Sequence, residues 1–164
     1  MFTGEDQAIA VLDETTLAYH RRESAVHYLA EHPTQTGIKR LVRALSDHEF
    51  AVRWAASVAL SQLGPPALPE VLRALADPEL NTARMREGAI HILHYSSDLA
   101  SILIHKHQHM EPKVYLKPGV LVSVGELMAA LKGPAADVSS MHAAGKLLLQ
   151  LENLSAGHFP KPPR

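Results

Sequence analysis

The feature that most constrains this chain is an internal repeat of 30 to 33 residues. The segment RRESAVHYLAEHP, which begins at Arg21, aligns with VRWAASVALSQLG, which begins at Val52, at a shift of 31 residues. The segments that follow, residues 38–47 and 68–77, align at a shift of 30 and share an Arg-Ala-Leu-x-Asp ending. A third and looser copy, RMREGAIHILHY, spans residues 84–95 at a shift of 33. A chain with such a repeat stacks similar units, each of which contacts its neighbours.

Each repeat unit has the pattern of two helices. In the second half of the first unit, apolar residues recur at i, i+3, i+4 and i+7, which predicts one buried stripe of an α-helix. The second unit repeats this spacing. The residues concerned are Ile38, Leu41, Val42 and Leu45, then Leu68, Val71, Leu72 and Leu75. The first helix of the second unit is rich in alanine, which permits close helix packing, and Gly64 followed by two prolines predicts where it ends.

This pattern resembles the HEAT repeat, in particular the short form found in bilin-lyase-type HEAT proteins. The residues that carry the resemblance are VRxAAxxALxxLG from Val52 and LxxLxD from Leu72, and it extends over about residues 15–108. The resemblance implies an all-α fold, a right-handed α-α superhelix of about three helix pairs. In that family an aspartate at the unit junction and the arginine of the Val-Arg pair form a polar ladder. Carried over to this chain, the ladder would join Asp47 with Arg53, and Asp77 with Arg84 or Arg86.

The repeats suggest a division of the chain into successive segments. We expect an N-terminal lead-in or cap at 1–14, repeat units at about 15–46, 47–76 and 77–110, and a degenerate capping helix pair at 124–154. Between the repeats and the cap, Pro118-Gly119 and several β-branched residues predict an irregular loop or short hairpin over 111–123. The tail, 155–164, is rich in proline and is expected to be extended or disordered.

Composition narrows the possible functions. The chain has 164 residues, 16 Lys and Arg against 17 Asp and Glu, a formal net charge of -1, and no cysteine. The balanced charge argues against a dedicated nucleic-acid or membrane-surface binder, and the missing cysteines exclude disulfides and thiolate chemistry. The sequence contains no long apolar run and no phosphate-binding loop or nucleophile elbow. We therefore expect a cytoplasmic protein that is not an enzyme and needs no cofactor.

Histidine is the overrepresented residue, with 11 in the chain. Five of them lie between positions 91 and 109, and several have helical spacing. One interpretation is a zinc or nickel site; the other, which we favour, is a set of surface imidazoles with an ordinary first-turn carboxylate nearby. The candidate ligands are Glu87, His91, His94, His105 and His109.

The exposed side of the second helices carries a series of cations. In stacked helical repeats the second helices line the concave surface, so these cations would form a basic strip. The strip comprises Lys39, Arg40, Arg43, Arg73 and Lys106. It is either a partner-binding face, with an acidic protein as partner, or a solvated face without a function. Trp54, in the first helix of the second unit, is expected to pack against a neighbouring helix.

The leading functional hypothesis is a non-catalytic scaffold or adaptor that binds another protein through its second helices. Two alternatives come from the resemblance. One is a chromophore or protein chaperone, or an enzyme, of the bilin-lyase type. The other is a HEAT-like nucleic-acid-binding domain, which would require a more basic concave face and an aromatic-lined pocket. The oligomeric state stays open.

Overall fold

The structure, a computed structural model, describes residues 2–64, 66–95 and 118–155, and this part of the chain is all-helical. The helices are α1 (Glu5–Asp13), α2 (Tyr19–Glu31), α3 (Gln35–Ala44), α4 (Phe50–Leu63), α5 (Leu68–Ala76), α6 (Ala83–Tyr95), α8 (Pro118–Lys132) and α9 (Ala136–Ser155). The helix pair α2–α3 lies within the range expected for the first repeat unit, and the pair α4–α5 lies within the range expected for the second. The chain is thus an α-solenoid over its repeats.

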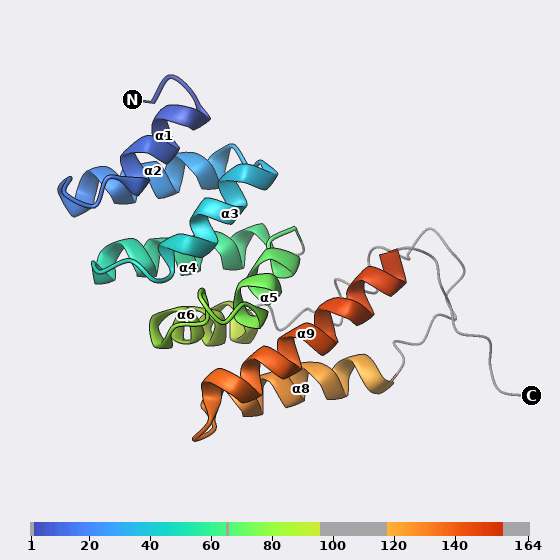
Figure 1. The fold of residues 1–164 in the computed structure, drawn as a ribbon. Coiled ribbons are helices and arrows are strands. Elements are labelled where there is room, and N and C mark those ends of the chain that lie inside the picture. The colour runs from blue at the N-terminus through green and yellow to red at the C-terminus, as the bar shows by residue number, and fades with distance from the viewer. Residues whose placement is uncertain (1, 65, 96–117, 156–164) are drawn as a thin grey trace, which may run out of the picture.

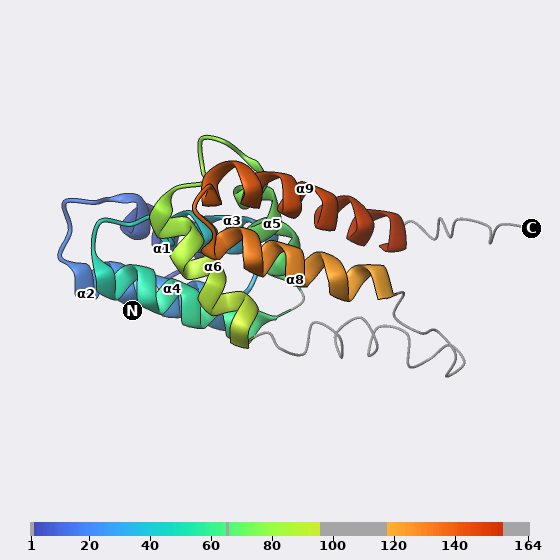
Figure 2. The ribbon, with the colours of Figure 1, turned by 90° about the horizontal axis from the view of Figure 1, so that it is seen from below.

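The helices form two layers (Figures 1 and 2). One layer contains α2, α4, α6 and α8, and the other contains α1, α3, α5 and α9. The strongest packing within the layers joins α2 with α4, α4 with α6, and α5 with α9. Each layer therefore contributes one row of stacked helices, and the core lies between the two rows.

The apolar stripes face this core. On α3 the residues Ile38, Leu41 and Val42 are buried, and on α4 the small residues Ala55 and Ala56 are buried. The buried alanines leave room for neighbouring helices to approach closely, since no long side chain separates the two backbones. The core thus depends on many small contacts, which accords with the low aromatic content of 5%.

Helix ends are set by local chemistry. The Thr34 side chain caps α3 by accepting a hydrogen bond from the Gly37 amide at 2.9 Å, and its hydroxyl donates to Glu5 on α1. Between the two helices of the second unit, Gly64 follows α4 with φ +64°, a positive value that glycine adopts without strain. The predicted end of this helix is confirmed.

The C-terminal helix pair lies at the end of the stack opposite α1 (Figure 1). Within it, α9 packs on α5, in the layer position that the second helix of the third unit would occupy. The remainder of the predicted third unit, residues 96–110, lies outside the described residues. The described stack therefore continues from α5 to α9 in one layer and from α6 to α8 in the other.

The expected loop or hairpin before the capping pair is corrected in part. Residues 118–123 form the first turns of α8, and the Pro118-Gly119 pair opens a helix instead of a turn. Proline suits a first helical turn because the amide hydrogen that it lacks would have no partner there. The β-branched residues that suggested strands have only a weak preference, which helical context overrides. Residues 111–117 lie outside the described part of the chain.

The buried side chain of Asn81 forms hydrogen bonds that connect the C-terminal helix pair, α8 and α9, to the repeats. The Asn81 side-chain amide, in the connection before α6, donates to the carbonyl of Leu75 at 2.6 Å, to the carbonyl of Asp137 at 3.2 Å and to Ser140 Oγ at 2.9 Å. Its Oδ1 accepts from Arg86 Nη1 at 2.9 Å. One side chain therefore links the consecutive helices α5 and α6 to α9, which is distant from them in sequence.

Candidate protein-binding site

A groove of about 400 Å³ lies between α3 and α5. Four of the five cations predicted to form the partner-binding strip line it, namely Lys39, Arg40, Arg43 and Arg73. Its apolar lining consists of Val42, Ala74 and Leu80. Lys106, the fifth cation of the predicted strip, lies outside the described residues. The repeat spacing thus brings cations of two successive units together on one face.

Two of these cations are neutralised by carboxylates. Arg40 pairs with Asp13 of α1 at 3.2 Å, and both side chains are partly exposed. Arg73 pairs with Glu70 at 2.5 Å and with Glu152 of α9 at 3.3 Å. These two arginines therefore hold neighbouring helices in place while they contribute to the groove.

The other two cations, Lys39 and Arg43, form no ion pair with any residue that the structure describes. Both are exposed, and they are four residues apart on α3, so they lie on the same side of this helix. The groove consequently carries positive charge that the described part of the protein does not neutralise.

A buried carboxylate forms part of the groove. Glu70 is 6% exposed, and its Oε1 accepts from Gln35 Nε2 at 2.5 Å as well as from Arg73. Because Gln35 begins α3 and Glu70 is in the first turn of α5, this contact fixes the spacing between the two helices that line the groove.

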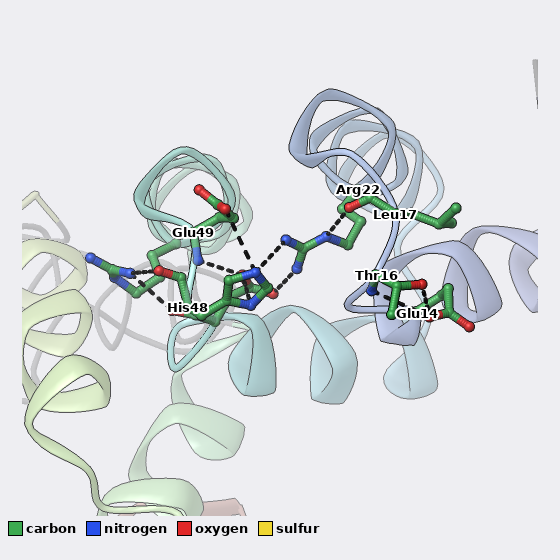
Figure 3. A network of polar contacts seen from close by, with 8 residues as sticks. Glu14, Thr16, Leu17, Arg22, His48 and Glu49 are labelled. Atoms are coloured by element: carbon green, nitrogen blue, oxygen red, sulfur yellow. Dashed lines mark hydrogen bonds and ion pairs between the residues drawn. The ribbon is translucent and has the colours of Figure 1, made fainter.

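The predicted polar ladder exists in a different form (Figure 3). The carboxylate of Asp47 pairs with Arg22 of the preceding unit, and the two side chains are 7% and 1% exposed. Arg22 Nε also donates to the carbonyl of Leu17 at 3.2 Å, and Nη2 lies 3.4 Å from His48 Nε2. The ladder contact therefore joins α2 to the connection between α3 and α4, through Arg22, which the repeat alignment places on the predicted ladder residue Arg53.

The arginines that were expected in the ladder bind main-chain oxygens. Arg53 Nη1 donates to the carbonyls of Asp47 at 2.9 Å and His48 at 3.0 Å, and Arg86 Nη1 donates to the carbonyl of Asn81 at 2.9 Å. Arg53 is thus joined to Asp47, but through the main chain. Asp77 accepts from the Glu79 amide at 2.8 Å, and within the described residues it forms no ion pair with Arg84 or Arg86.

The histidine cluster is only partly described. Glu87, His91 and His94 lie on α6, and the described residues contain no group of three potential ligands arranged around one point. His105 and His109 lie outside the described part of the chain. The His91 ring instead contacts Trp54, with centroids 4.7 Å apart. Partial burial, followed by the nearby charge of His94, lowers the pKa of His91.

Trp54 packs against a neighbouring helix, as expected, through His91 of α6, yet its indole is not buried. It is 50% exposed and stacks on Phe50, which is 61% exposed, with ring centroids 6.3 Å apart. The repeat alignment contained the signal for this exposure, because Glu23 and Glu87 occupy the corresponding position in the other two copies. A charged residue there indicates a solvent-facing position.

Comparisons with known proteins identify the repeat. A family model for HEAT repeats matches residues 5–93, which is more than half of the chain and extends from α1 into α6. Comparisons with curated proteins and with solved structures gave no significant match. Among the described residues, no helix has the length and apolar character to cross a membrane. The repeated helix pairs, their two-layer stacking and the family match together place this chain in the HEAT-repeat family.

Proposed function

We propose that this protein is a non-catalytic, cytoplasmic scaffold or adaptor that binds an acidic protein segment in the groove between α3 and α5. The observation that carries this proposal is the pair Lys39 and Arg43, which add positive charge to a groove of about 400 Å³ without a carboxylate partner among the described residues. HEAT repeats are helical scaffolds typically used for protein interaction, so the family membership supports the same function.

A protein ligand suits this groove better than a nucleic acid. The lining contains four cations, two carboxylates and several aliphatic residues, and the described lining has no aromatic side chain on which a base could stack. An acidic protein segment can direct carboxylates to the cations and aliphatic side chains to Val42 and Leu80.

Charge reversal at the two unpaired cations tests the proposal. Partners are captured from an extract of the native cell, identified, and then bound as purified proteins to Lys39→Glu plus Arg43→Glu. We expect affinity to fall at least about tenfold and to become less dependent on salt, since electrostatic complementarity is lost.

The matched control is Arg21→Glu plus Lys132→Glu, which changes the net charge equally at exposed positions outside the groove. This control should bind its partner as the native chain does. Equal affinity of the two double variants would overturn the assignment of the groove. Circular dichroism confirms that both variants remain helical.

A further inference from the structure

A second pocket, of about 210 Å³, lies between α4 and α6 in the other helix layer. Its lining includes Phe50, Trp54 and His91, together with Arg53, Arg84 and Glu87. Neither the repeat packing nor the groove between α3 and α5 accounts for this combination of aromatic and charged side chains.

The aromatic side chains are held in place while exposed to solvent. The rings of Phe50 and Trp54 are within 18° of parallel, and Trp54 also contacts His91 of the next repeat unit. Exposed aromatic side chains with fixed geometry are typical of the residues that dominate protein-protein affinity, because they bind without losing much conformational freedom.

The charged residues around the rings favour a negatively charged ligand. The Arg53 guanidinium lies 5.5 Å from the centre of the Phe50 ring and is fixed by main-chain carbonyls, so no carboxylate of the described residues neutralises it. Arg84 is exposed and forms no ion pair with any described residue. Glu87 is the single carboxylate in the pocket's described lining, and the two arginines exceed it by one charge.

We propose that this pocket binds a peptide segment in which an aromatic or large aliphatic side chain is adjacent to an aspartate or glutamate. The apolar side chain would pack against Trp54 and Phe50, and the carboxylate would pair with Arg84. The volume supports a peptide anchor, since about 210 Å³ is below the ~300–1,000 Å³ typical of small-molecule sites. This protein would then have two binding surfaces, one on each helix layer.

Peptide selection on the full chain tests the proposal and requires no identified partner. A random peptide library is displayed on phage, selected on the native chain and counter-selected on Arg84→Glu. We expect the enriched peptides to share an aromatic or large aliphatic residue next to a carboxylate. Because the chain contains a single tryptophan, a synthetic copy of an enriched peptide should also change the intrinsic fluorescence of Trp54 on binding.

Variants on the two layers separate this site from the groove. Labelled-peptide anisotropy should show binding at least about tenfold weaker for Trp54→Ala and for Arg84→Glu, which both alter exposed side chains. Arg43→Glu, in the groove between α3 and α5, should leave the affinity unchanged. The proposal is overturned if no peptide is enriched, if the enriched peptides lack the carboxylate, or if Trp54→Ala binds them as well as the native chain.

Discussion

At the scale of single residues, the buried pair of Arg22 and Asp47 is the most consequential contact between repeat units. Both groups are removed from solvent, and each satisfies the other's charge. A buried ion pair does not necessarily stabilise a fold relative to apolar residues, but removal of one partner leaves an uncompensated buried charge. Removal of Asp47 is therefore expected to lower the stability of the fold, because Arg22 would stay buried without a counter-charge.

A comparison of the two junction aspartates, Asp47 and Asp77, measures how much the ion pair with Arg22 contributes to stability. Asp47 and Asp77 each accept a main-chain amide two residues ahead at 2.8 Å, but Asp47 also pairs with Arg22. We expect Asp47→Ala to lower the free energy of unfolding by about 3–5 kcal/mol, and Asp77→Ala by about 1 kcal/mol. Urea denaturation measures both values. Similar losses in the two variants would show that the ion pair is unimportant.

His91 should make stability depend on pH. Partial burial, and then the charge of His94, lower the pKa of His91 in the folded chain below its ordinary value of about 6.5. The neutral form is thus favoured in the folded state, and the contribution of His91 to stability is unchanged above about pH 6.5 and decreases as the pH falls below it.

An NMR titration of His91 tests this assignment. In Trp54→Ala the pKa of His91 should move up toward its ordinary value, because loss of the neighbouring indole exposes more of the His91 ring to solvent. His94→Gln should also raise the pKa, by a smaller amount, since His94 is the lesser cause. A His91 pKa at or above the ordinary value in the native chain, or one unaffected by loss of Trp54, would contradict the geometry.

At the scale of helices, the spacing of apolar residues predicted the buried helix faces, whereas the polar residues did not predict which side chains pair across helices. The stripe on α3 and the glycine end of α4 follow from local rules, so the sequence alone indicated them. The clamp at Asn81 joins residues 56 and 59 positions apart, and the Arg22 pair spans 25. Such partners are brought together only by stacking, and one sequence contains no local signal for them.

Two glycines in different backbone environments, Gly64 after the end of α4 and Gly145 within α9, test whether Gly64 ends its helix. Gly64→Ala places a side chain at φ +64° and should lower stability by about 1–2 kcal/mol. Gly145→Ala, within α9, meets no atom within 4 Å and should raise stability by about 0.5–1 kcal/mol, because alanine favours the helix. Thermal unfolding distinguishes the two signs. Equal effects would mean that Gly64 does not terminate α4 as described.

At the scale of the whole molecule, the two helix layers separate two chemically different surfaces. The layer with α3 and α5 presents cations beside aliphatic residues, while the layer with α4 and α6 presents exposed aromatic rings. The C-terminal pair extends both layers and contributes Glu152 to the pair with Arg73 near the groove. The position of α9 therefore affects the proposed binding site directly.

Loss of the Asn81 clamp should loosen the C-terminal pair selectively. Asn81→Ala leaves Ser140 and two main-chain carbonyls without their amide donor, which weakens the contact between α9 and the repeats. Hydrogen exchange should become faster in α9 and α8 while α2 and α4 keep their protection. Asn153→Ala, an exposed asparagine on α9, serves as the control. Uniform acceleration across all helices would argue against a local clamp.

The most direct measurement of the central claim is an NMR titration of the ¹⁵N-labelled chain with an octaglutamate peptide. If the groove between α3 and α5 is the acidic-partner site, chemical-shift changes will be concentrated at residues 36–43 and 70–80, and added salt will reverse them. Lys39→Glu plus Arg43→Glu will abolish them. Changes that are spread over the surface, or that persist in this double variant, would contradict the account.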